Sequence, residues 1–221
     1  MKKAFTMIEL IFILVVIGIL AVVIIPRTKT NSLQEAAVQL ISHIRYTQHL
    51  AMISDKYGIV DLSDSDNEAN EWYKGRWQIL FYSGAAAENK EAYTIFSDRG
   101  KFGGDASKLE IAINPENSNQ VMSGGFSGSN SLDIRKEEFI GIKKMNLGLS
   151  YGITNVEFKD GCAGYVHLTF DKLGRPITGT HNKNGSSHSL IKEKCTIELS
   201  NEDESISIII EPETGYSRIQ F

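Results

Sequence analysis

The chain has 221 residues, 42% of them hydrophobic, and a formal net charge of −4 at pH 7. This length fits one domain of ordinary size beside a separate N-terminal segment, and the apolar content suffices for a core. No block of basic residues stands out, so composition gives no electrostatic case for nucleic-acid binding, which depends on clustered Lys and Arg.

Residues 1–26 form the most informative segment. Lys2 and Lys3 precede an apolar run, and residues 10–25 carry no charge. A helix over residues 5–25 would be about 31 Å long, which matches a hydrocarbon core of roughly 30 Å. The two lysines would keep the N-terminus cytoplasmic and place residues from Arg27 onward outside. We therefore expect a transmembrane helix over residues 5–26.

A cleavable secretory signal peptide is the alternative for this segment. Its cleavage site requires small residues after the apolar run, whereas bulky residues stand at 22–26. It also has no use for the carboxylate of Glu9, and a charge at this depth is costly and usually functional. The sequence therefore favours a helix that is retained.

Residues 4–10, AFTMIEL, together with the apolar run, closely resemble the type III signal of type IV pilins and type II secretion pseudopilins. The matching positions are Phe5, Thr6, Glu9, Leu10, Gly18 and Pro26. The resemblance implies that residues 1–4 are a leader peptide and that a prepilin peptidase cuts between Ala4 and Phe5. The same enzyme would methylate the new Phe5 amine. Ala4 departs from the family pattern, which usually has glycine there.

The resemblance also assigns Glu9, Gly18 and Pro26 to assembly. A carboxylate in lipid is stabilised by a nearby cation, and cleavage would create the Phe5 amine at the same depth. In the family, this carboxylate of an incoming subunit pairs with the amine of a neighbour. A self-paired or snorkelling Glu9 is the alternative. Because the subunit at a filament tip can lack this residue, Glu9 argues against the outermost tip position.

A second helix is predicted after the apolar run. Pro26 disfavours helix around it, so we expect a break over residues 26–31. Ser32 and Glu35 then fit a capping box. Apolar residues follow at helical spacing up to about Lys56, with one polar lapse at Thr47-Gln48. These positions are Leu33, Ala37, Leu40, Ile41, Ile44 and Ala51. The pattern predicts an amphipathic helix within residues 27–57 that packs on the following domain.

Residues 58–221 read as a β-rich globular domain, because short apolar runs alternate with turn residues. The predicted strands are Tyr57–Leu62, Trp77–Tyr82, Tyr93–Ser97, Leu109–Ile113, Phe139–Met145, Val156–Phe158, Tyr165–Phe170, Thr196–Leu199, Ile206–Ile210 and Tyr216–Phe221. The last three are expected to form a meander. The fold class is therefore α+β: a long N-terminal transmembrane-to-amphipathic helix packed on an antiparallel sheet or sandwich, as in pilins.

Two long loops interrupt this domain, over residues 115–133 and 179–189. Both are rich in Gly, Ser and Asn, and composition favours disorder for the first. The region over residues 62–146 shows no pattern of a known family, and we interpret it as an insertion particular to this protein.

Two C-terminal segments, LTFDKLGRPIT (168–178) and SIIIEPETGYSRI (207–219), resemble signatures of the minor pseudopilin H, or FimT-like, family. There, Gly-Arg-Pro follows a strand, and a Pro-x-Thr-Gly turn joins the last two strands. The matching turn residues here are Gly174, Arg175, Pro176 and Gly215. We expect Gly174 to adopt a positive φ, Pro176 to stop strand pairing and Gly215 to close a tight hairpin.

The chain has two cysteines, Cys162 and Cys195, and the expected topology places both outside the membrane, where conditions can be oxidising. A disulfide closing this loop would contribute about 4 kcal/mol through loop-closure entropy. Two free thiols are the alternative, since sequence does not show the geometry. We favour the disulfide.

No motif predicts a catalytic or metal site. Residues 125–129 approach G-x-S-x-G but lack the final glycine, and Ser189 with Lys192 fits S-x-x-K, a pattern common by chance. The acidic loop over residues 61–71 fails the calcium-loop spacing and is expected to be solvated. The histidines show no ligand spacing with the cysteines. We expect no enzyme, cofactor or metal.

The leading interpretation is a minor pseudopilin of a type II secretion pseudopilus. It would be a single-pass inner-membrane protein with a cytoplasmic N-terminus and a periplasmic C-terminal domain. Its expected partners are the prepilin peptidase, other pseudopilins or pilins of the filament, and the inner membrane. The alternative is a minor type IV pilin of a DNA-uptake (competence) or adhesive pilus. Residues 27–221 carry 21 basic and 26 acidic residues, which disfavours DNA binding.

Overall fold

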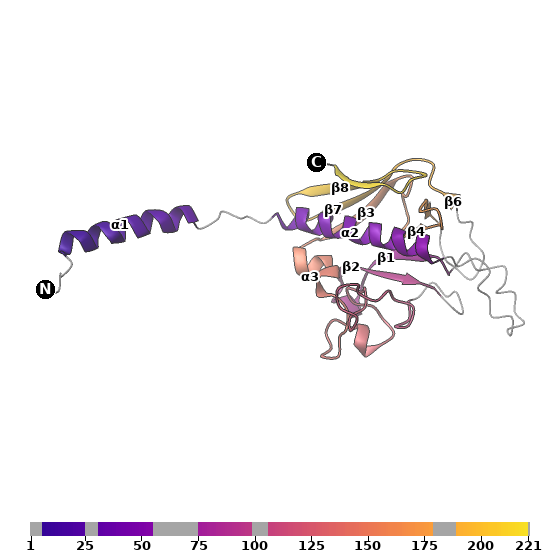
Figure 1. Ribbon diagram of the computed structural model, residues 1–221. Helices are drawn as coiled ribbons and strands as arrows, with labels where there is room; N and C mark the ends of the chain where they lie inside the picture. The colour runs from indigo at the N-terminus through magenta and orange to yellow at the C-terminus, as the bar shows by residue number, and fades with distance from the viewer. Residues whose placement is uncertain (1–5, 25–30, 55–74, 99–105, 179–188, 221) are drawn as a thin grey trace, which may run out of the picture. The chain divides into compact units, whose positions relative to one another are not determined.

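The structure is a computed structural model that describes residues 6–24, 31–54, 75–98, 106–178 and 189–220 (Figure 1). The chain divides into two compact units, Met1–Asn31 and Ser32–Phe221. The first unit contains helix α1 (Met7–Ile24), with Glu9 in its first turn. Among the described residues, no helix combines the length and apolarity needed to cross a membrane. The transmembrane role of residues 5–26 therefore stays a prediction.

Helix α2 (Ser32–Ile53) begins at the serine expected to start it. All the apolar positions predicted for its packing face are buried, and Ala36 and Thr47 are buried with them. Thr47 is accommodated because its hydroxyl donates to the His43 carbonyl at 2.8 Å, one turn earlier. The predicted break falls largely on residues 25–30, outside the described residues. The amphipathic helix is thus confirmed.

The second unit holds two antiparallel sheets. The five-stranded sheet has the order β2-β1-β4-β5-β6, and the four-stranded sheet has the order β3-β7-β8-β9. The strands are β1 (Trp77–Gly84), β2 (Lys90–Ser97), β3 (Asn155–Asp160), β4 (His167–Phe170), β5 (Pro176–Thr178), β6 (Ser189–Leu190), β7 (Cys195–Ser200), β8 (Ser205–Ile210) and β9 (Ser217–Gln220). The α+β class is confirmed, and the last three strands form the predicted meander.

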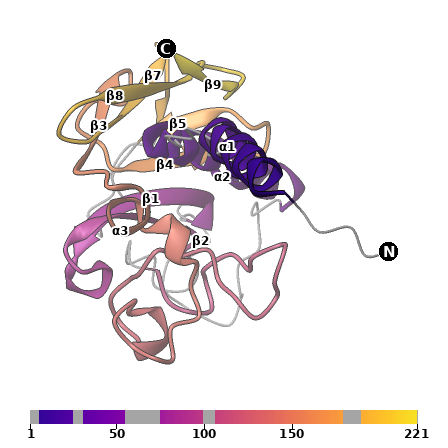
Figure 2. The ribbon, with the colours of Figure 1, turned by 90° about the vertical axis from the view of Figure 1, so that its left-hand side faces the viewer.

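Helix α2 packs against strands of both sheets: β1 and β4 of the first, and β7, β8 and β9 of the second. Figure 2 shows the four-stranded sheet on one side of α2 and the β1–β2 hairpin on the other. Phe81 joins the two halves of the core, because its ring lies 5.5 Å from that of Tyr93 and 5.3 Å from that of Phe158. One continuous apolar core therefore includes the buried face of the helix.

Two strand predictions are wrong. Leu109–Ile113 and Phe139–Met145 form only isolated bridges, at Ile111, Ile113 and Gly141, and a 3-10 helix, η5 (Lys143–Met145), replaces the end of the second. Helix α3 (Leu147–Tyr151) follows, and η3 (Ala85–Ala87) and η4 (Asn130–Leu132) are further short turns. The predicted strand Tyr57–Leu62 lies outside the described residues.

The disorder predicted for residues 115–133 is also wrong. This loop is built onto β2: the Ile95 N–H donates to the Met122 carbonyl at 2.9 Å, and the Gly124 N–H donates to the Tyr93 carbonyl at 3.0 Å. The hydroxyls of Thr94 and Ser123 lie 2.8 Å apart within this contact. The Ser123 hydroxyl and the backbone of residues 121–124 are hydrogen-bonded inside the fold, so the composition of the loop does not indicate disorder. Residues 179–188 of the second long loop lie outside the described residues.

Candidate functional site

Helix α1 is apolar around its whole circumference. Its described large apolar side chains, from Met7 to Ile19, have exposed fractions between 36% and 83%. A lone helix cannot bury such side chains against itself, and burying each one elsewhere is worth about 1.5–3 kcal/mol. A helix that is apolar all round is ordinarily buried against other apolar groups.

Glu9 is the charged residue of this helix. Its Oε2 accepts hydrogen bonds from the backbone N–H and the hydroxyl of Thr6, both at 3.4 Å, so they are weak. No cation among the described residues pairs with the carboxylate, which is exposed. Gly18 lies on the same helix, and nothing lies within 4 Å of a Cβ placed on it. Ala4, Phe5 and Pro26 lie outside the described residues.

The two turns predicted from the C-terminal segments meet on α2. The Gln48 side-chain amide donates to the Gly174 carbonyl at 2.7 Å and to the Thr214 carbonyl at 2.8 Å. Gly174 and Gly215 have φ values of +78° and +65°. A Cβ on Gly215 would lie 2.5 Å from the Gly174 carbonyl oxygen and 2.6 Å from Gln48 Nε2. The two turn motifs are therefore one structural site.

Arg175 closes the first of these turns. Its Nε donates to Asp171 Oδ2 at 2.7 Å, and its backbone N–H donates to Asp171 Oδ1 at 2.8 Å. The prediction that Pro176 stops strand pairing is wrong. It begins β5 opposite Phe170, where a residue without an N–H is tolerated. Its carbonyl accepts from the Ile191 N–H at 3.1 Å.

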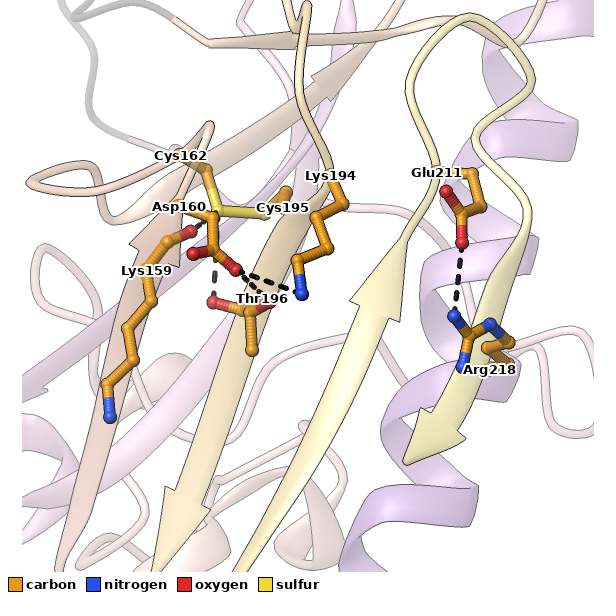
Figure 3. A network of polar contacts seen from close by, with 8 residues as sticks. All are labelled: Lys159, Asp160, Cys162, Lys194, Cys195, Thr196, Glu211 and Arg218. Carbon is orange, nitrogen blue, oxygen red and sulfur yellow. Dashed lines mark hydrogen bonds and ion pairs between the residues drawn. A yellow bond between two sulfur atoms is a disulfide. The ribbon is translucent and has the colours of Figure 1, made fainter. Parts of the chain in front are cut away.

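Cys162 and Cys195 form a disulfide with their Cα atoms 5.0 Å apart. The bond ties the turn after β3 to the start of β7 (Figure 3). Beside it, the Thr196 hydroxyl donates to Asp160 Oδ2 at 2.6 Å, and Lys194 Nζ lies 3.8 Å from the same oxygen. The disulfide is confirmed over two free thiols.

A polar network that the sequence analysis missed lies between α2, β2 and α3. The Tyr151 hydroxyl donates to Gln39 Oε1 at 2.7 Å, and Gln39 Nε2 donates to the Tyr93 hydroxyl at 2.8 Å and to the Lys144 carbonyl at 2.9 Å. The Tyr93 hydroxyl lies 2.7 Å from Nδ1 of His43. Since this hydroxyl accepts from Gln39, it is placed to donate to His43, whose Nδ1 then carries no proton.

Burial acts on both ends of this contact. It lowers the pKa of His43 to about 4 and raises the pKa of Tyr93 above its ordinary value. His43 is therefore neutral at pH 7, in agreement with its role as acceptor. In the sequence, this network is indicated only by the spacing of Gln39, His43 and Thr47, which puts polar side chains on one helix face.

The remaining candidates are the Ser189–Lys192 pair and the acidic loop. Ser189 and Lys192 are both exposed. No group of acidic, histidine or cysteine side chains in the described ranges could hold a metal ion. The acidic loop over residues 61–71 lies outside those ranges. No family model, curated protein or solved structure matches this chain. Function is therefore inferred from its own residues and geometry.

Proposed function

We propose that the protein is a minor pseudopilin, a non-enzymatic assembly subunit of a type II secretion pseudopilus. One observation carries the proposal: α1 exposes apolar side chains all round and bears a single carboxylate, at the fifth position counted from Phe5. The resemblance of residues 1–26 to the type III signal supports it.

In this proposal the helix acts in two successive environments. Residues 5–26 first anchor the subunit in the inner membrane, with the leader in the cytoplasm and residues from Arg27 onward in the periplasm. After the prepilin peptidase removes residues 1–4, the helix moves into the filament. Both environments bury the apolar side chains, which would otherwise be exposed to water.

Glu9 would select the filament over the membrane. A carboxylate without a partner is costly in lipid, so pairing with the Phe5 amine of a neighbouring subunit favours assembly. The side chain is exposed, and no cation of a described residue pairs with it.

The globular unit would supply partner specificity. Its disulfide is consistent with an oxidising periplasm. Within this unit, the sheets are held to α2 by an extensive apolar face and by the Gln48 contacts to both turns.

Replacing Glu9 tests this function. We expect Glu9→Val to insert in the membrane as the natural protein does, because it replaces a carboxylate by an apolar side chain, and to lose most of its incorporation into filaments. The measurement is the fraction of the protein that co-sediments with sheared filaments, compared with the fraction in membranes. Val16→Ile, an apolar change on the same helix, is the matched control. Normal incorporation of Glu9→Val would contradict the pairing mechanism.

A further inference from the structure

Strand β9 is an edge of the four-stranded sheet, because β8 is its one neighbour in the strand order. Edge strands present unpaired backbone groups that can accept another strand. Natural edges are often blunted by charged side chains, bulges or covering segments. The residues along this edge therefore decide whether β9 can pair with another strand.

The hydrogen-bonding alternation shows which backbone groups face outward. The Glu211 N–H donates to the Tyr216 carbonyl at 2.9 Å, so the next bonded pair of this ladder is Ile209 with Arg218. Ser217 and Ile219 then direct their backbone groups away from β8. Arg45 confirms this direction, because its Nη2 donates to the Ser217 carbonyl at 2.7 Å. No other described element bonds the N–H or carbonyl of Ile219 on this side.

A groove of about 490 Å³ runs between α2 and this strand. We call it the edge groove; it is lined by Val38, Ile41, Ser42, Arg45, Arg218 and Ile219. Its apolar surface comes from Val38, Ile41 and Ile219. Val38 is 55% exposed, on a helix that buries most of its apolar residues.

Two guanidinium groups border the edge groove. Arg218 pairs with Glu211 at 3.3 Å (Figure 3), an exposed contact of small value. Arg45 is held in place by the Ser217 carbonyl and by the Tyr216 ring, whose centroid lies 6.0 Å away. No carboxylate among the described residues pairs with Arg45. A positioned guanidinium beside an apolar floor is complementary to an acidic side chain flanked by apolar ones.

We propose that the edge groove binds an extended segment of another protein by β-strand addition. The segment would pair its backbone with Ile219, place apolar side chains against Val38 and Ile41, and direct a carboxylate to Arg45. Main-chain bonds provide affinity in this mode, and alternate side chains provide specificity. The inference is independent of the proposed assembly role of Glu9.

A blocked peptide, Val-Thr-Glu-Thr-Val, whose Val and Glu side chains share one face of an extended strand, tests the proposal by NMR titration of the full chain in detergent micelles. We expect the amide signal of Ile219 to shift on binding. The same peptide with Lys in place of Glu should bind about tenfold more weakly, because the charged contact to Arg45 is lost.

Three variants separate the parts of the groove. Arg45→Gln can still donate to the Ser217 carbonyl but lacks charge, so it should weaken the Glu peptide about tenfold and should not weaken the Lys peptide, which no longer faces a like charge. Ile219→Pro removes an outward N–H outside the β8 ladder and should abolish binding of both. Val38→Asp, at an exposed position, should repel the Glu peptide. Arg135→Gln, a remote exposed arginine, is the control.

Three results would overturn the proposal. The first is the absence of shifts in residues 218–220 at millimolar peptide. The second is equal binding of the Glu and Lys peptides. The third is a concentration-dependent dimer that protects the Ile219 amide, because the edge would then belong to a second copy of this chain.

Discussion

Gln48 shows how a single side chain can organise a domain. It stands on α2 at a position that interrupts the apolar pattern, yet its amide holds two carbonyls from turns far apart in the sequence. Both turns need glycine, at Gly174 and Gly215, because the backbone there has a positive φ and lies close to Gln48. Gln48, which interrupts the apolar pattern of the helix, is therefore the residue that joins the two turns.

Gly215→Ala should destabilise the protein by at least about 2 kcal/mol, because its Cβ would collide with the Gly174 carbonyl oxygen 2.5 Å away. Gly164→Ala is the matched control, since that residue has a φ of +78° with nothing within 4 Å of the added atom. It should cost only about 1 kcal/mol, from the left-handed backbone. Urea unfolding of the full chain in detergent measures both, and equal losses would contradict the close packing of the turns.

His43 should make stability depend on pH. Its folded-state pKa of about 4 lies below the ordinary value of 6.5, so the unfolded chain binds the proton more strongly between these values. The stabilisation is complete above pH 6.5 and is lost as the pH falls toward 4. At pH 5 the loss should be about 2 kcal/mol.

Urea unfolding at pH 7.5 and pH 5 measures this loss, and His43→Gln is the control. The variant keeps a hydrogen-bonding side chain but cannot titrate, so its stability should change less over this range. An identical pH dependence in the two proteins would show that His43 is not the responsible group.

At the scale of elements, α2 was predictable because its pattern is long and its partners are strands on both sides. The buried face from Leu33 to Ala51 follows directly from helical periodicity. The structure of residues 109–113 and 139–145 was not predictable in this way, although both segments contain buried apolar residues such as Ile111 and Met145. Their backbone bonds go to several partners in turn, so no ladder forms, and a local pattern does not show this.

The same limit explains the loop over residues 115–133. Its Gly and Ser content resembles that of disordered segments, but β2 supplies hydrogen-bond partners from elsewhere in the chain. The edge groove likewise combines helix positions 38–45 with strand residues 218 and 219. Such sites depend on tertiary pairing, which the sequence of either segment alone does not contain.

The disulfide should stabilise the junction between the turn after β3 and the start of β7. It closes a loop with a sequence separation of 33, so the double variant Cys162→Ala, Cys195→Ala should lose about 4 kcal/mol of unfolding free energy. Urea unfolding measures the loss. Reducing the natural protein should produce a similar drop, and unchanged stability in both cases would exclude a structural role for this bond.

At the scale of the whole molecule, two units with different needs share one chain. The unit Ser32–Phe221 buries its apolar residues around α2, whereas the described apolar side chains of α1 remain exposed. The sequence was most informative about α1, because Glu9 within an apolar run is visible without any tertiary contact. We propose that the first unit provides the anchor and filament core, and that the second presents the edge groove to another protein.

The mature N-terminus tests the central claim most directly. Mass spectrometry of the protein isolated from cells that contain a prepilin peptidase should identify a chain that lacks residues 1–4 and begins with N-methylated Phe5. That result would establish both the cut after Ala4 and the amine proposed to pair with Glu9. A chain that keeps Met1, or one that begins at a site beyond the apolar run, would contradict the pseudopilin assignment.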